Sequence, residues 1–164
     1  MMESKKVLIS ILNWMKYEDT IACIRFIKKN TTYYNYKIVV VDNNSTNDSI
    51  KLIKSAFPEL TVIHSNQNLG YAAGHELGVN EAKKINADYI WLLNPDTEVQ
   101  KDALEHLLKA AQKYGDAVYG SLILNEDTTI QSCGESAISS DFKINYAENL
   151  TNNFSGKKYE NVSD

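Results

Sequence analysis

Four short polar segments carry the residue types that could bind a ligand. They are Asn13–Trp14, Asp42–Ser45, Asn66–Asn68 and Asn94–Glu98. Each segment comes at the end of a run of aliphatic and aromatic residues, and runs without strict alternation favour strands that are buried on both faces of a parallel sheet. Ligands of such sheets bind beyond the carboxyl ends of the strands. The four segments therefore predict one site at one edge of a sheet.

Asp42 follows three valines, so its carboxylate is expected where a strand stops. There it could accept a hydrogen bond from a nucleobase N–H or from a ribose hydroxyl, both of which need an acceptor. The alternative interpretation is structural, because Asp among turn-forming residues often caps the following turn. The residues alone weight the two interpretations equally.

Asp96 lies just past another predicted strand, with Glu98 two residues later. Carboxylate oxygens beside a diphosphate are a usual way to hold a hard divalent cation. The competing interpretation is a helix cap, since acidic residues suit the first turn of a helix. Both interpretations stay open from the residues alone.

Glycines recur every four residues at Gly70, Gly74 and Gly78, which places them on one helical face and would let that helix approach the sheet or a phosphate closely. No Gly-x-Gly-x-x-Gly follows the first predicted strand, and the sequence has no P-loop motif. His75 begins a pattern similar to that of zinc proteases, but Val79 stands where a second His is needed. Dehydrogenase, P-loop and zinc-protease chemistry are thus disfavoured.

Aromatic side chains beside the polar segments could stack on a base or a sugar. Trp14, Tyr71 and Trp91 are the candidates, and Trp14 is the one adjacent to a predicted site residue. Aromatic residues at strand ends more often belong to the core. Stacking by Trp14 is therefore the minority interpretation.

The predicted elements alternate between strands and helices. Strands are expected at residues 7–12, 37–41, 60–64, 87–93 and 117–124, with helices at 17–29, 48–56, 70–86 and 100–114. This order predicts an α/β domain with a mostly parallel sheet. Residues 127–132 could pair as a further strand, and the polar tail 149–164 is expected to be poorly ordered.

Composition narrows the class of protein. The chain has 164 residues, 43% of them hydrophobic and 23% charged, with a net charge of −4, so it suits a globular domain and lacks the basic field that nucleic-acid binding needs. No apolar run approaches the length of a membrane span, and no secretion signal precedes the first strand. The two cysteines, Cys23 and Cys133, are expected to be reduced thiols. A cytoplasmic chain is predicted, with peripheral attachment to the inner face of the membrane left open.

Four linked motifs resemble the nucleotide-sugar-binding half of family-two glycosyltransferases, with the closest similarity to the rhamnosyltransferase-like branch. The similarity covers about residues 5–125. The motifs, in chain order, are Ile11-Leu-Asn-Trp14, Val41-Asp-Asn-Asn-Ser-Thr46, Asn68-Leu-Gly-Tyr-Ala-Ala-Gly74 and Leu93-Asn-Pro-Asp-Thr-Glu98.

The resemblance implies a three-layer GT-A fold, here truncated in its C-terminal part, a UDP- or dTDP-sugar donor, and a divalent metal, Mn²⁺ or Mg²⁺. The metal would be held at Asp96, because Asn94 replaces the first Asp of the family's metal motif. By the same carry-over, Asp42 would contact the base or ribose. The implied donor-binding residues are Asn13, Trp14, Asp42, Asn44, Ser45, Asn68, Gly70, Gly74, Asn94 and Asp96.

The family is expected to transfer the sugar to a saccharide or cell-surface polysaccharide acceptor with inversion, using a downstream carboxylate as base. No catalytic base is assigned in this chain, because its later carboxylates stand in no recognisable motif; they are Glu126, Asp127, Glu135, Asp141 and Glu148. The alternative is a nucleotide-sugar-binding module without turnover.

The expected partition is a donor-binding domain at residues 1–125 and a partial acceptor-side segment at residues 126–164. An exposed sheet edge near residues 121–124 would favour a homo-oligomer, because an unpaired apolar edge invites association.

Overall fold

The chain divides into two compact units, Met1–Lys101 and Asp102–Asp164, in a computed structural model that describes residues 4–115, 117–125, 127–132 and 145–146. The first unit alternates strands and helices from its start. Its elements are β1 (Val7–Asn13), α1 (Tyr17–Asn30), β2 (Tyr36–Asp42), α2 (Ser49–Ala56), β3 (Thr61–His64), α3 (Gly70–Lys84) and β4 (Tyr89–Leu93).

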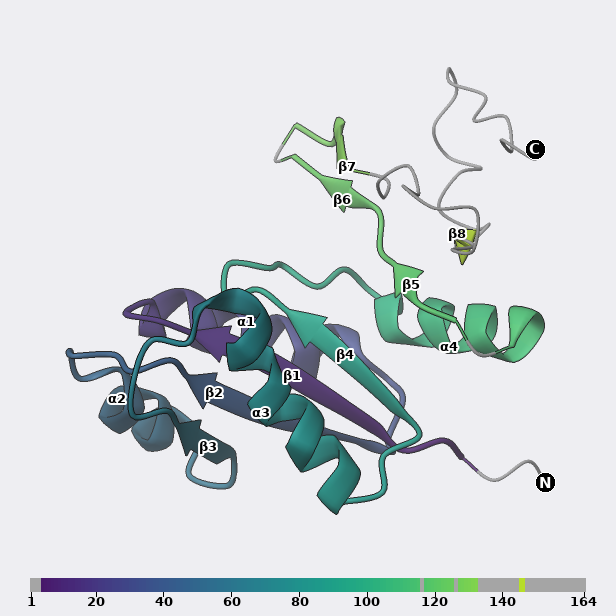
Figure 1. Ribbon diagram of the computed structural model, residues 1–164. Helices are drawn as coiled ribbons and strands as arrows, with labels where there is room; N and C mark the ends of the chain where they lie inside the picture. The colour runs from purple at the N-terminus through teal and green to yellow at the C-terminus, as the bar shows by residue number, and fades with distance from the viewer. Residues whose placement is uncertain (1–3, 116, 126, 133–144, 147–164) are drawn as a thin grey trace. The chain divides into compact units, whose positions relative to one another are not determined.

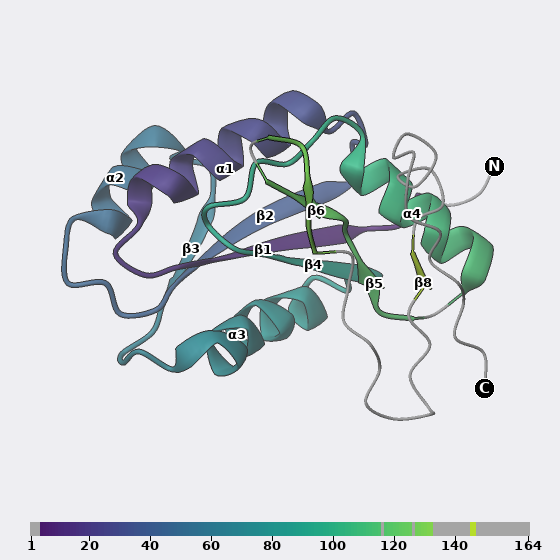
Figure 2. The same ribbon diagram turned by 90° about the horizontal axis from the view of Figure 1, so that it is seen from above.

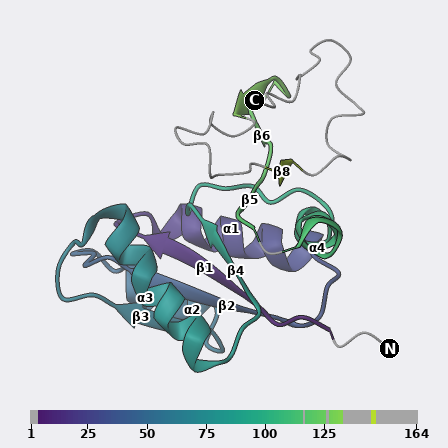
Figure 3. The same ribbon diagram turned by 45° about the vertical axis from the view of Figure 1, so that its right-hand side comes forward.

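The four strands form one sheet in the order β3-β2-β1-β4, and every neighbouring pair is parallel (Figure 1). Helices α1 and α2 cover one face, and α3 covers the other (Figure 2). Figure 3, which views the molecule from another side, shows α3 running along the sheet. The predicted parallel α/β architecture is confirmed, and it is a three-layer arrangement.

Burial explains why the sequences of the two central strands, β1 and β2, are nearly continuous apolar runs. All seven residues of β1 are buried, as are the last five of β2. Side chains of a strand alternate between its faces, so a strand covered on both sides needs apolar residues at every position. On the α3 face, Leu8, Val39 and Ala82 form a buried cluster. The core of the first unit therefore lies on both faces of its sheet.

Two glycines set the distance between α3 and the sheet. A Cβ atom at Gly78 would lie 2.1 Å from Ser10 Oγ, and one at Gly74 would lie 2.7 Å from Leu12 Cδ1. Both distances are so short that a Cβ atom at either position would force its neighbour to shift. The predicted close approach of this helical face is thus confirmed, and its partner is β1.

The second unit includes α4 (Ala103–Tyr114), which is followed by Gly115 with a φ of 86°, a backbone conformation that glycine adopts readily. Its short strands are β5 (Tyr119–Gly120), β6 (Ile123–Leu124), β7 (Ile130–Ser132) and β8 (Asn145–Tyr146). β5 pairs with β8 in parallel, and β6 pairs with β7 antiparallel. The predicted single strand at 117–124 is therefore wrong, whereas the expected pairing within 127–132 is confirmed.

Several sequence predictions concern residues outside the described ranges. The tail 149–164 lies there, together with Cys133 and the carboxylates Glu126, Glu135, Asp141 and Glu148. Val118 and Ile123 are exposed in the described part of the second unit, and the suggested association through this region stays a prediction. Among the helices that the structure describes, none is long and apolar enough to cross a membrane.

Candidate functional site

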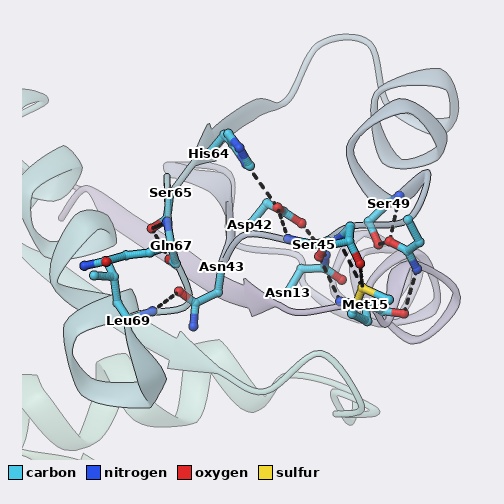
Figure 4. Close-up of polar contacts among 12 residues, drawn as sticks. Asn13, Met15, Asp42, Asn43, Ser45, Ser49, His64, Ser65, Gln67 and Leu69 are labelled. Atoms are coloured by element: carbon cyan, nitrogen blue, oxygen red, sulfur yellow. Dashed lines mark hydrogen bonds and ion pairs between the residues drawn. The ribbon is translucent and has the colours of Figure 1, made fainter.

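The last residues of three neighbouring strands stand side by side at the carboxyl edge of the sheet. Asn13 of β1 is opposite Asp42 of β2, which is in turn opposite His64 of β3. Residues that are in register on parallel strands point to the same face, so the three side chains form a row. Figure 4 shows this row and its hydrogen bonds.

Asp42 lies at the centre of the row and is fully buried. Its Oδ2 accepts a hydrogen bond of 2.7 Å from the Asn13 amide, and its Oδ1 accepts one of 2.9 Å from the Ser45 backbone N–H. Oδ1 is also 3.2 Å from Nδ1 of His64. A buried carboxylate requires such partners. The bond to Ser45 N confirms that Asp42 caps the following turn, while leaving its role toward a ligand open.

Asn13 is held as firmly as the carboxylate it contacts. Thr20 Oγ1, from α1, donates to Asn13 Oδ1 at 2.8 Å, and the Asn13 amide also reaches Ser45 Oγ at 3.1 Å. Ser45 Oγ in turn accepts the Met15 N–H at 2.8 Å. The loops after β1 and β2 are thereby joined through Asn13 and Ser45, which fixes the shape of this part of the edge.

Two residues of these loops adopt a left-handed backbone. Met15 has a φ of 62° and Asn44 a φ of 64°. Asn tolerates this conformation, whereas Met rarely adopts it. The Met15 turn is secured from the neighbouring loop, because Asn47 Nδ2 donates to the Met15 carbonyl at 3.1 Å. The cost of an unfavourable backbone is thus offset by bonds between the two loops.

Asn43 connects the β2 edge to the start of α3. Its Oδ1 accepts the Leu69 N–H at 2.9 Å, and its amide donates to Asn68 Oδ1 at 2.9 Å and to the Gly70 carbonyl at 3.1 Å. Asn68 Oδ1 also accepts the Gly70 N–H at 2.9 Å. Gly70 has a φ of 76°, and a Cβ there would meet open space. Conformation, and not crowding, therefore favours glycine at this position.

Aromatic rings at the same edge are open to solvent. Trp14 is 55% exposed directly after Asn13, and Tyr71 is 59% exposed in the first turn of α3. Trp91 on β4 is only partly exposed. Trp14 is therefore not a core residue, contrary to the interpretation that the sequence favoured, and its ring is free to meet a planar group.

Asn94 and Asp96 follow β4, and both are exposed. The expected alternative for Asp96, a helix cap, is wrong, because the next helix begins only at Ala103 after Asp102. Among the residues that the structure describes, no hydrogen bond engages the Asp96 carboxylate, and no cluster of three or more His, Cys, Asp or Glu could hold a metal. Asp96 thus offers a single open carboxylate.

Cys23 of α1 supports the loop that carries Asp96. Its Sγ is 3.9 Å from the Asn94 carbonyl. Burial, with a smaller contribution from the nearby Asp96 charge, raises the pKa of Cys23 to about 12. The thiol is therefore neutral, and it packs as a small apolar group beneath the loop.

His75 is a buried polar residue on α3. It is 2% exposed, and within the described part of the chain neither ring nitrogen has a hydrogen-bond partner. The Tyr71 ring meets it edge-on with centroids 4.7 Å apart. Burial lowers the pKa of His75, so the ring is held in its neutral form.

The structure brings five of the ten predicted donor-binding residues into two linked groups. Asn13, Asp42 and Ser45 form one, Asn68 and Gly70 form the other, and Asn43 joins the second group to β2. Sequence reasoning did not select Thr20 or His64, and it included Asn43 in a polar segment without giving it a role of its own. The signal for His64 was its place at the end of a predicted strand, which becomes informative only once that strand is known to be next to β2.

Sequence comparison finds a glycosyltransferase among the proteins that are similar to this chain. The chain is 30% identical over 125 residues to the glycosyltransferase GlyG of Streptococcus pneumoniae serotype 4, a match that covers 74% of this chain and 40% of GlyG. The chain thus spans about two fifths of the length of this relative.

Solved structures with the same fold include two glycosyltransferases. S. aureus TarS 1-349 in complex with UDP-GlcNAc superposes with a TM-score of 0.65 at 12% identity, covering 78% of this chain and 37% of the TarS 1-349 chain. The mannosyltransferase PcManGT of Pyrobaculum calidifontis, in complex with GDP-Man and Mn²⁺, gives a TM-score of 0.59 at 16% identity, covering 76% and 37%. At these identities the likeness establishes the GT-A fold. Because the family model described as Glycosyl transferase family 2 matches residues 7–155, the chain belongs to that family.

Proposed function

We propose that the chain binds a nucleoside diphosphate sugar, a UDP- or dTDP-sugar, at the carboxyl edge of β1, β2 and β4. As part of a glycosyltransferase, it would present the sugar for transfer to a saccharide acceptor such as a cell-surface polysaccharide. The observation that carries the proposal is the Asp42 carboxylate, buried at the centre of this edge. Ligands of open parallel sheets bind at that edge.

The nucleoside is assigned to the edge of β1 and β2. Asp42 would accept a hydrogen bond from the base or from a ribose hydroxyl, and the exposed ring of Trp14 would stack on the base. Asn13, Asn44 and Ser45 would shape the pocket through the bonds that hold the two loops together. A rigid, prebuilt pocket loses little entropy when a ligand binds.

The diphosphate is assigned to the loop after β4 and to the first turn of α3. Asp96 would hold Mn²⁺ or Mg²⁺, and the donor's phosphate oxygens would supply further ligands, since Mg²⁺ is commonly bound by one or two carboxylates plus substrate phosphates. Such a metal neutralises charge on the leaving diphosphate. Asn94, with its exposed amide, would donate a hydrogen bond to the nucleotide-sugar, and Asn68, Gly70 and Gly74 would border that ligand.

Transfer with inversion needs a carboxylate that takes the proton from the acceptor hydroxyl. No residue of the chain is assigned this role, and Asp127, the one late carboxylate in the described part, is engaged by Thr129. The chain spans about two fifths of GlyG. The proposed activity is therefore that of the whole enzyme, and the chain is assigned the donor-binding part of it.

Calorimetric titration with UDP and with dTDP, each with and without Mn²⁺, tests the donor site. We expect one of the two nucleotides to bind in a Mn²⁺-dependent manner, and Asp96→Ala to weaken that binding more than about tenfold, because it removes the charged ligand. Glu59→Gln is the matched control: it alters an exposed carboxylate just before β3, at the opposite edge, and should leave binding unchanged.

The outcomes separate the hypotheses. If neither UDP nor dTDP binds, the proposed donor site is refuted. Nucleotide binding without transfer of a labelled sugar to any added saccharide would favour the alternative, a donor-binding module without turnover. Nucleotide binding that is equally tight with and without Mn²⁺, and equally tight in Asp96→Ala, would support the nucleoside assignment and refute the metal assignment.

A further inference from the structure

His64 is the last residue of β3, and its ring lies against the Asp42 carboxylate at 3.2 Å. The His64 side chain is 46% exposed, whereas that of Asp42 is wholly buried. In Figure 4 the His64 ring reaches Asp42 from the side opposite to Ser45. A carboxylate can only accept, so Nδ1 of His64 carries the hydrogen of this contact.

The other two hydrogen-bond donors to Asp42 cannot move away without disrupting the structure of the carboxyl edge of the sheet. The Asn13 amide is buried, and Thr20 fixes its orientation. The Ser45 donor is a backbone N–H in the turn that Asp42 itself caps. His64 is therefore the one donor to Asp42 in the described structure that is both a side chain and open to solvent.

This difference matters for any ligand that is to reach Asp42. Because the carboxylate has no exposed surface, an incoming N–H or O–H group must first displace a group that covers it. His64 is the group whose displacement costs least, since its ring can turn into water and hydrogen-bond there. Removing the Asn13 amide instead would leave buried polar atoms without partners.

We propose that His64 is a displaceable cap on the nucleoside subsite: its Nδ1–H occupies Asp42 Oδ1 in the free chain and gives way to a donor group of the base or ribose. The inference rests on the proposed function, in which Asp42 binds the nucleoside. His64 is thus a residue that sets affinity through Asp42. A cap of this kind weakens nucleotide binding by the net strength of its own hydrogen bond.

Calorimetry with UDP and dTDP on the full 164-residue chain tests the cap with two variants. His64→Ala removes the Nδ1–H, and the nucleotide that binds should do so about two- to tenfold more tightly, the range that follows from the net value of one hydrogen bond. His64→Asn keeps an N–H donor near the same position and should bind as the parent does. His106→Ala, in the second unit, is the control, and thermal unfolding of each variant verifies the fold.

A second measurement follows the ring itself. In ¹⁵N NMR spectra of the free chain, we expect His64 to be protonated at Nδ1, and we expect that hydrogen bond to disappear when the nucleotide saturates the site. Unchanged or weaker binding by His64→Ala, or an Nδ1–H signal that persists in the complex, would overturn the cap alone. Failure of both the parent and His64→Ala to bind either nucleotide would instead overturn the proposed function, and the cap with it.

Discussion

The amide of Asn13 donates a 2.7 Å hydrogen bond to the carboxylate of Asp42, and both side chains are fully buried. The two residues end adjacent parallel strands in register. A buried carboxylate next to a buried amide is stable only while each keeps its partners, so the candidate site is also part of what holds this edge together.

Replacing Asn13 should therefore cost stability as well as ligand binding. Asn13→Ala removes the amide donor to Asp42 and one of the two acceptors of the Thr20 hydroxyl, which keeps the Lys16 carbonyl at 2.9 Å. We expect a loss of about 2–4 kcal/mol in the free energy of unfolding, because buried polar groups would lose their partners. Urea denaturation measures it. Asn80→Ala, at an exposed position on α3, should change stability by less than about 0.5 kcal/mol, and equal effects of the two changes would contradict the argument.

The close contact between Gly78 and Ser10 gives a second prediction. Gly78→Ala places a methyl group 2.1 Å from Ser10 Oγ and 2.8 Å from Ser10 Cβ, so α3 must move away from β1. We expect a destabilisation of about 1–3 kcal/mol, typical of overpacking. Gly120→Ala is the control, because a Cβ there meets nothing within 4 Å.

The same pair allows a rescue test. Ser10 Oγ is buried without a hydrogen-bond partner in the described structure. Ser10→Ala alone should be neutral or slightly stabilising, since it removes an unsatisfied group. Combined with Gly78→Ala, it should recover part of the lost stability, because the shortest contact involves the hydroxyl oxygen. Additive effects in thermal unfolding would show that the two positions do not meet.

The sequence was sufficient for the first unit because its two central strands are buried on both faces and each outer strand is a short, mainly apolar run. Continuous apolar runs predicted the four strands to within about two residues, and the glycine spacing predicted the close helix. The predicted strand at 117–124 failed for a different reason: Ser121 and Leu122 interrupt it, and β5 pairs with β8, about 25 residues away. Pairing between distant short segments leaves no periodic signal.

The same distinction applies to the site. Asp42 was identifiable because it follows a buried strand directly. The role of Asn43 was not identifiable, since it depends on where the start of α3 lies, and His64 was not, since its role depends on which strands are neighbours and on their register. His64 reaches Asp42 only because β3 lies beside β2 with these two residues opposite each other, and strand order is set by the packing of helices that local sequence does not specify.

Cys23 should be chemically inert in the folded chain. With its pKa raised to about 12 by burial and by the Asp96 charge, its thiolate fraction at pH 8 falls about a thousandfold below that of an ordinary cysteine. In a Cys133→Ser background, a thiol-reactive dye should label the native chain slowly and the urea-unfolded chain at the ordinary rate. Rapid labelling of the native chain would mean that the thiol is not buried in the folded chain.

His75 makes the stability of the chain depend on pH. Burial lowers its folded-state pKa below the ordinary 6.5, so the unfolded chain binds a proton first as the pH falls. The contribution of the neutral ring to stability is thus complete above about pH 6.5 and is lost progressively as pH falls from there to the lowered pKa, with a slope of at most about 1.4 kcal/mol per pH unit. Urea denaturation between pH 8 and pH 5 measures this loss. His75→Leu, which cannot be protonated, should flatten the profile relative to the parent chain, whereas His106→Leu should leave the slope as it is. A parent profile equal to that of His75→Leu would show that the ring reaches water or a proton donor in the folded chain.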